Sequence, residues 1–230
     1  MTTLYANLQA VNKRIERACS AAGRDRTSVT LLAVAKTFPA QAVRAAFAAG
    51  QQAFGESYVQ EALAKQAQLA DVDAQWHFIG PLQSNKTRAV AEHFGWVHSV
   101  ERLKISERLA EQRPADLPPL NVCVQVNISG EASKRGCPPG QAAALCHAIA
   151  RLPNLTLRGL MAIPEPTTDS ALARRRFASL RALRDELNSS GLALDTLSMG
   201  MSDDLEAAIL EGATIVRVGT AIFGERDYPQ

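Results

Sequence analysis

The sequence predicts a (β/α)8 barrel, an α/β fold, formed by residues 1–230 as a single domain and beginning with an N-terminal helix. Short apolar runs alternate with helical stretches along the chain, which indicates a parallel sheet. The runs number eight, with a helix after nearly every one, and eight units close a barrel. A length of 230 residues lies near the lower size limit of this barrel and leaves no space for a second domain. A doubly wound open sheet is the alternative, because alternation alone does not demonstrate closure.

The first expected element is a helix over residues 1–22. Leu4, Leu8 and Val11 recur at helical spacing on one face, and Gly23 provides the stop. The eight expected strands are apolar runs between turn and helix signals. They cover residues 29–35, 52–55, 76–80, 96–100, 120–128, 156–163, 194–199 and 214–219.

The helices between these strands are bounded by glycine, proline or a capping hydroxyl. They cover residues 41–49, 57–69, 84–94, 102–112, 141–152, 170–189 and 203–211. Ser84 and Ser202 are the expected N-caps of two of them, because a serine hydroxyl accepts a hydrogen bond from an unpaired backbone N–H.

The composition excludes several classes of function. With 25 basic and 23 acidic residues the formal charge is +2, so we expect no strong attraction to nucleic acid or to a membrane surface. No segment has the pattern of a signal peptide or of a membrane span. The four cysteines form no CxxC pair and no metal-ligand spacing. We therefore expect a cytoplasmic protein with reduced thiols and no metal site.

A lysine follows the first strand. The run "LLAVA" reads as a strand buried on both faces, and Lys36 comes directly after it. The carboxyl ends of all strands in a parallel barrel meet at one rim, where active sites lie. Lys36 is therefore a candidate nucleophile. The simpler interpretation is that the strand stops there and that water solvates the lysine.

The last two strand ends have the features of an anion site. The segment 199–203 (MGMSD) presents a glycine and the Ser202 hydroxyl at a helix start, and Gly219 and Thr220 repeat this pair after the last strand. Helix N-termini bind anions, and these two loops are the recurrent phosphate position of such barrels. We include Met199 among the candidate binding residues. The alternative is that Ser202 only caps its helix and Gly219 only turns the chain.

Arg217 adds a cation to the same rim. It alternates with Val216 and Val218, so its guanidinium points into the barrel if the two valines pack beneath the helices. An amine, a cation and a phosphate cradle favour a phosphorylated aldehyde. Either a sugar phosphate, as in Schiff-base aldolases, or pyridoxal 5′-phosphate fits. An arginine beside a pyridine nitrogen favours the second.

Several long motifs occur in a characteristic order. They are "LLAVAKT" (31–37), "FGESYVQE" (54–61), "WHFIGPLQSNK" (76–86), "GLMAIP" (159–164), "LSMGMSDDLEAAI" (197–209) and "VRVGTAIFGER" (216–226). With them the chain resembles the pyridoxal phosphate homeostasis proteins, which are related in fold to the N-terminal barrel of alanine racemase.

The resemblance implies a monomeric single-domain barrel that holds pyridoxal 5′-phosphate as a Schiff base on Lys36. Arg217 would face the pyridine nitrogen, and Ser202, Gly219 and Thr220 would hold the phosphate. It also implies a role in intracellular vitamin B6 homeostasis, with effects on amino-acid and keto-acid balance and with apoenzymes as candidate recipients of the cofactor.

Two further candidates are less specific. Ser57 stands where the family usually has asparagine, so a hydrogen bond near the cofactor is expected to be lost. His77 alternates with Ile79 and either faces the lumen beneath the cofactor or is an ordinary core histidine.

The sequence favours a carrier over an enzyme, and no catalytic residue is assigned. A racemase of this fold resembles a two-domain dimer whose second domain brings a catalytic tyrosine. The tyrosines Tyr5, Tyr58 and Tyr228 do not follow a barrel strand as an obvious second base. The alternatives are a pyridoxal-phosphate-dependent amino-acid racemase and a Schiff-base aldolase acting on a sugar phosphate.

Overall fold

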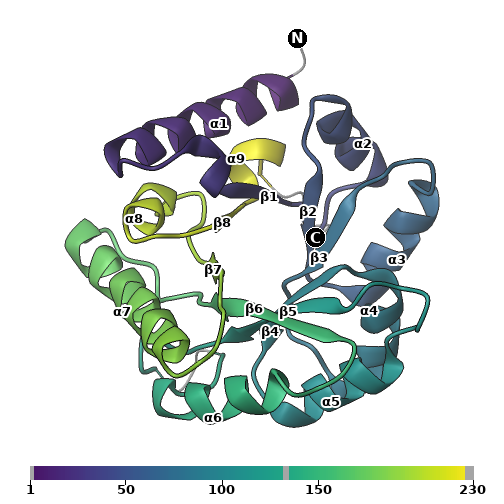
Figure 1. The fold of residues 1–230 in the computed structure, drawn as a ribbon. Coiled ribbons are helices and arrows are strands. Elements are labelled where there is room, and N and C mark those ends of the chain that lie inside the picture. Colours follow the sequence, from purple (N-terminus) through teal and green to yellow (C-terminus); the bar gives the residue numbers. More distant parts are fainter. Residues whose placement is uncertain (1–2, 132–134, 226–230) are drawn as a thin grey trace.

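The expected barrel closes. The computed structural model describes residues 3–131 and 135–225, which form eight parallel strands in the order β1 to β8, with β8 paired to β1 (Figure 1). The open sheet is thereby excluded. The strands are β1 (Thr30–Val34), β2 (Ala53–Glu56), β3 (Gln75–Phe78), β4 (Trp96–Val100), β5 (Leu120–Gln125), β6 (Leu155–Met161), β7 (Thr196–Ser198) and β8 (Ile215–Val218).

A ring of helices surrounds the strands, and the expected N-terminal helix is present (Figure 1). The helices are α1 (Thr3–Ala21), α2 (Ala40–Ala48), α3 (Val59–Gln68), α4 (Thr87–His93), α5 (Leu103–Gln112), α6 (Pro139–Ile149), α7 (Ser170–Ser189), α8 (Leu205–Leu210) and α9 (Thr220–Phe223). Short 3-10 turns cover Arg26–Ser28 and Ser84–Lys86. No helix of the described residues has the length and apolar character needed to cross a membrane.

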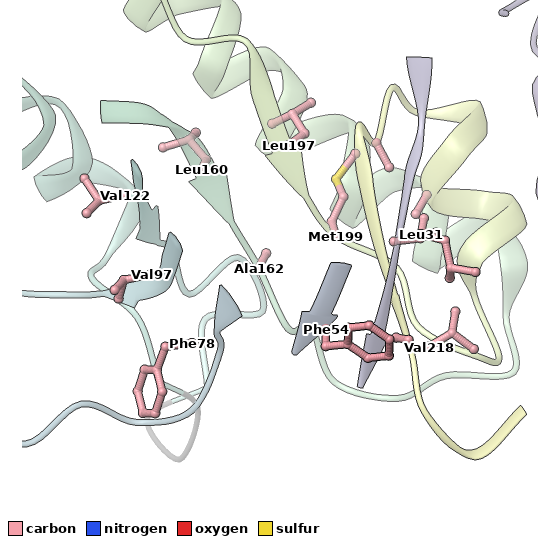
Figure 2. Packing of buried hydrophobic residues seen from close by; sticks show 14 of the residues in the cluster. Leu31, Phe54, Phe78, Val97, Val122, Leu160, Ala162, Leu197, Met199 and Val218 are labelled. Carbon is pink, nitrogen blue, oxygen red and sulfur yellow. The ribbon is translucent and has the colours of Figure 1, made fainter. Parts of the chain in front are cut away.

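Alternation along the strands separates two layers of side chains. One set, which includes Leu31, Phe54 and Met199, packs in the large apolar core that also contains residues of the helices (Figure 2). The neighbouring residues, such as Leu32 and Ala53, form a smaller apolar cluster with Ile215 inside the barrel. Because side chains alternate strictly, the polar residues between the outer apolar ones enter the lumen.

Two helix starts differ from the sequence-based expectation. Residues 84–86 form a 3-10 turn, and no side chain caps α4 at Thr87. The prediction that Ser202 caps the following helix is also wrong, because α8 begins only at Leu205. In that turn the Asp204 carboxylate accepts a hydrogen bond from the Met201 N–H at 2.6 Å. The N-cap residue of α8 is Asp204, and no side chain caps this helix.

Candidate functional site

A cavity of about 330 Å³ opens at the carboxyl end of the barrel. Of the eight predicted cofactor-binding residues, all of which the structure describes, six line this cavity and two do not. The six are Lys36, Ser57, Ser202, Arg217, Gly219 and Thr220. The apolar side chains of Ile79 and Ile163 line it as well. The sequence-predicted strand ends therefore meet in one place.

Lys36 lies just beyond the end of β1 and is half-buried. The chain still follows the sheet at the preceding residue, because the Ala35 N–H donates to the Gly55 carbonyl at 2.9 Å. Thr37 then turns sharply, with a φ of 70°, a left-handed value that is uncommon for a residue other than glycine. This turn ends the strand where the lysine side chain reaches the cavity.

Arg217 enters the lumen from β8 and is 4% exposed. Its Nη1 donates to the Ser198 hydroxyl at 2.8 Å, and its Nη2 donates to the Ala162 carbonyl at 2.9 Å. Burial lowers the pKa of the guanidinium to about 10, against the opposing charge of Asp204, so Arg217 remains a cation at neutral pH. The alternation of Arg217 with the buried Val216 and Val218 predicted that the guanidinium points into the barrel.

A chain of hydrogen bonds continues from Arg217 into the barrel. The Ser198 hydroxyl lies 2.8 Å from His98 Nδ1, and His98 Nε2 lies 2.9 Å from His77 Nδ1. The ring of His77 also stacks on Trp96, with centroids 5.2 Å apart. His77 Nε2 has no partner among the described residues. His77 therefore lies at the far end of this chain rather than in the wall of the mouth cavity.

The chain has a preferred direction. The Arg217 guanidinium can only donate hydrogen bonds, so the Ser198 oxygen accepts from it, and the Ser198 hydroxyl donates to His98 Nδ1. His98 then donates from Nε2 to His77, which carries its hydrogen on Nε2. With the opposite tautomers, His98 would donate from Nδ1 to the Ser198 oxygen. The Ser198 hydrogen would then have no acceptor, and His77 Nε2 would still have no partner among the described residues. Burial lowers the pKa of His77 to about 3, and burial together with His77 and Arg217 holds the pKa of His98 well below its usual range, so both rings are neutral.

The turn after β7 depends on a glycine. Gly200 has a φ of 92°, and a Cβ there would lie 2.5 Å from the Ala208 Cβ. The turn holds Ser202 at the cavity, whereas the Met199 side chain packs in the apolar core, away from the cavity (Figure 2). Gly219 follows β8 and lines the same cavity, and a Cβ there would approach the Val34 carbonyl oxygen to 3.2 Å.

Thr220 begins α9, a short helix that the sequence analysis did not predict. Its first turn follows Gly219 directly. The first backbone N–H groups of α9, which have no intrahelical partners, therefore lie near the cavity that the Ser202 and Thr220 side chains line. A helix of four residues is too short to produce an apolar period, which is why sequence patterns do not detect it.

The sequence analysis also missed Ser198 and His98. Ser198 lies between two buried apolar residues, Leu197 and Met199, so period-two alternation carried the signal for a lumen-facing side chain there. His98 lies between Val97 and the polar Ser99, so its signal was weaker. Their contact with each other joins residues 100 positions apart, which no local pattern reveals.

A second cavity, of about 390 Å³, lies beneath the barrel near Trp76, Trp96 and Arg113. Its lining contains no lysine, so it offers no amine for an aldehyde. Among the described residues, no three histidine, cysteine or acidic side chains gather as a metal site.

Comparison with known proteins identifies the relatives of this chain. The family described as "Alanine racemase, N-terminal domain" matches residues 6–227. The chain is 66% identical over 228 residues to the "Pyridoxal phosphate homeostasis protein" of Pseudomonas aeruginosa, covering 99% of this chain and 98% of that one. It is 49% identical over 235 residues to the protein of the same name from Escherichia coli K12, covering 99% of each chain.

Solved structures agree with this result. PipY of Synechococcus elongatus, solved with PLP bound, is 41% identical and has a TM-score of 0.81, covering 92% of this chain and 100% of PipY. Alanine racemase of Corynebacterium glutamicum has a TM-score of 0.69 at 18% identity. The match covers 95% of this chain and 62% of the racemase, and at this identity it supports the fold alone.

Proposed function

The chain belongs to the family of pyridoxal phosphate homeostasis proteins, and we propose that it binds pyridoxal 5′-phosphate at the carboxyl end of its barrel. The observation that carries the proposal is the meeting of Lys36, Arg217 and the hydroxyls of Ser202 and Thr220 in one cavity. The proposed domain comprises residues 1–230.

The residues present suit this cofactor chemically. A primary amine suits its aldehyde, a buried guanidinium suits its pyridine nitrogen, and two hydroxyls with a close-approaching glycine suit its phosphate. The apolar side chains of Ile79 and Ile163 line the same cavity and suit the faces of an aromatic ring. A sugar phosphate would leave the buried Arg217 without a ring nitrogen to contact, so the aldolase alternative explains less of the site.

The covalent step is a reversible condensation. Lys36 would hold the cofactor by replacing the aldehyde oxygen with a C=N bond, and that oxygen would leave as water with the two hydrogens of the amine. Hydrolysis reverses the step and returns the free aldehyde. Bound in this way, the group can act as an electron sink for amino-acid chemistry.

The remaining residues orient and retain the ligand. Ser202, Gly219 and Thr220 hold its phosphate, and Ser57 borders the aldehyde side of the cavity. Met199 acts indirectly by anchoring the turn that carries Ser202. His77 acts indirectly as well, through the chain of hydrogen bonds that ends at Arg217.

We assign the chain a homeostatic role and no efficient catalysis. The relatives described above are named as homeostasis proteins, not as enzymes. The proposed protein is a cytoplasmic monomer that retains pyridoxal 5′-phosphate and releases it to apoenzymes.

The decisive experiment locates the covalent bond. Reduction of the loaded protein with borohydride, followed by proteolysis and mass spectrometry, is expected to place the pyridoxyl group on Lys36. The Lys36→Ala variant is expected to lose the visible absorbance band and tight retention of the ligand, while Lys86→Ala, at a 3-10 turn, retains both. An adduct on another lysine, or a variant as yellow as the parent, contradicts the proposal.

A further inference from the structure

The peptide that carries Lys36 is not held by the β-sheet alone. β1 ends at Val34, and Thr37 adopts a left-handed backbone conformation. For a threonine this conformation is strained and persists only where surrounding groups impose it. The position of the Lys36 side chain therefore depends on whatever holds the backbone on either side of it.

Two side chains of α3 make these contacts. The Lys65 ammonium donates to the carbonyl of Ala35 at 2.8 Å, and the Glu61 carboxylate accepts from the N–H of Thr37 at 2.5 Å. One contact lies immediately before Lys36 and the other immediately after it. Since Glu61 and Lys65 are four residues apart, they lie on one face of α3.

Glu56, the last residue of β2, completes the group. Its side chain is fully buried, and its Oε1 accepts from Lys65 Nζ at 2.5 Å. The Glu61 carboxylate accepts a third hydrogen bond from the same ammonium, at 3.1 Å. All three donors of Lys65 are thus satisfied by Ala35, Glu56 and Glu61.

This arrangement is more than is needed to attach a helix to a barrel. Burying an ammonium and a carboxylate is unfavourable unless both are paired, and apolar residues of similar size usually serve as well. Here the Lys65 ammonium, paired with Glu56, donates to the carbonyl of the peptide bond between Ala35 and Lys36, the proposed nucleophile.

We infer that Glu56, Glu61 and Lys65 form a clamp that fixes the backbone of Lys36 and directs its amine at the aldehyde. They are positioning residues and do not touch the ligand. This inference rests on the proposed function, because it assumes that Lys36 is the reacting amine. The competing interpretation is that the three residues only anchor α3 to the barrel.

Two aldehydes distinguish these interpretations. If the clamp positions the amine, its loss should slow the binding of pyridoxal 5′-phosphate and of pyridoxal, which lacks the phosphate, by the same factor. We expect Lys65→Met to reduce the rate of absorbance change with both aldehydes by a similar factor, about tenfold to a hundredfold, as small misplacements of a reacting group do. Arg44→Met is the matched control, because Arg44 pairs with Asp71 at the opposite end of α3 and is exposed.

A second pair of variants avoids the buried position. Glu61→Gln keeps an oxygen for the Thr37 N–H, whereas Glu61→Ala removes it. We expect Glu61→Gln to capture both aldehydes within about threefold of the parent and Glu61→Ala to be slower by about tenfold, at a temperature where circular dichroism shows both variants folded. If Lys65→Met fails to fold, this pair decides.

The outcomes distinguish a failure of the proposed clamp from a failure of the proposed function. Folded variants that capture both aldehydes at the parent rate, or that lose only the phosphorylated one, overturn the clamp. A parent protein that captures neither aldehyde overturns the proposed function instead.

Discussion

Arg217 is a buried cation that donates hydrogen bonds to two neutral groups, the Ser198 hydroxyl and the Ala162 carbonyl. Such a charge contributes little to folding, because its desolvation offsets its hydrogen bonds. Contact with the proposed ligand, pyridoxal 5′-phosphate, would account for a charge at this buried position. Ser198 is likewise explained by the proposed site, because its hydroxyl accepts a hydrogen bond from the Arg217 guanidinium and so orients it, while donating one to His98.

This division between stability and binding leads to a prediction for Arg217→Met. Methionine fills a similar volume without the charge, so the free energy of unfolding of the ligand-free protein should change by no more than about 2 kcal/mol. The affinity for pyridoxal 5′-phosphate should fall by about tenfold to a hundredfold, the usual value of a charged hydrogen bond. Denaturant unfolding and an absorbance titration measure the two quantities. A large loss of stability with unchanged affinity would show that Arg217 serves the fold.

The buried histidines predict sensitivity to acid. His77 has a pKa of about 3 in the folded protein against 6.5 when unfolded, so the unfolded chain binds the extra proton. Its stabilising contribution is present above pH 6.5 and is lost as the pH falls towards 3. Between about pH 7.5 and 5.5 the parent should lose about 1.4 kcal/mol more than His77→Asn.

Comparing parent and variant is necessary because Glu56 acts in the opposite direction. Burial raises the pKa of Glu56 to about 7, so its folded form gains a proton as the pH falls through this range. That contribution is common to both proteins and cancels in the difference. Parallel stability curves for parent and His77→Asn would refute the assignment of His77 as a buried neutral ring.

At the level of elements, α1 connects the two turns assigned to the phosphate. Arg14 forms a bidentate pair with Glu206, at 2.7 and 2.8 Å, and also donates to the Ser202 carbonyl at 2.8 Å. Asn7 of the same helix donates to the Ile222 carbonyl of α9 at 3.1 Å. Figure 1 shows α1 lying across α8 and α9. The N-terminal helix thus supports the loops after β7 and β8 from outside the barrel.

We therefore expect Arg14→Met to weaken binding only through the phosphate. A half-exposed bidentate pair is worth about 1 kcal/mol, so the affinity for pyridoxal 5′-phosphate should fall about fivefold. The affinity for pyridoxal should not change. Arg17→Met is the control on the same helix, because Arg17 is exposed. Equal losses for the two aldehydes would mean that α1 supports the whole barrel rather than these turns.

The elements also show what sequence patterns can and cannot predict. All eight strands were predicted because buried parallel strands are apolar runs, and Arg217 was placed correctly because period two is strict. The N-caps expected at Ser84 and Ser202 are not formed, since α4 begins at Thr87, α8 begins at Leu205 and no side chain caps either helix. A capping residue type does not by itself fix the residue at which the first helical turn begins. The proposed clamp of Glu56, Glu61 and Lys65 was missed because Glu61 and Lys65 resemble an ordinary solvated helix surface in the sequence, and their contacts with Glu56 and with the backbone around Lys36 join different elements.

At the level of the whole molecule, the two ends of the lumen differ. The carboxyl end opens into the cavity with Lys36, whereas Arg158 covers the ring of Trp96 at the amino end, 4.9 Å from its centroid. Arg158 is held there by Asp195 at 2.7 Å and by Asn121 at 3.0 Å. The candidate ligand site therefore opens at the carboxyl end of the barrel, and the chain of side chains from Arg217 to Trp96 continues from it into the lumen.

The close relatives of this chain are named as homeostasis proteins and not as enzymes, so the proposed loaded protein should turn over amino acids slowly. We expect the loaded protein to convert L- and D-amino acids at rates far below about 1 s⁻¹, the lower range for ordinary enzymes. A steady-state assay with a panel of both enantiomers measures this. Turnover at or above that rate, abolished by Lys36→Ala, would favour the racemase alternative.

The pairing of β1 with β8, from Thr30 with Ile215 to Ala33 with Val218, has a consequence for biosynthesis. The proposed amine follows the first strand and the proposed phosphate turn follows the last, so neither half of the chain contains the whole proposed site. On this assignment, a ribosome-bound chain that still lacks β8 has an unpaired β1 edge and is expected not to retain the vitamin. Acquisition of colour during translation would thus report the moment at which the terminal strand docks.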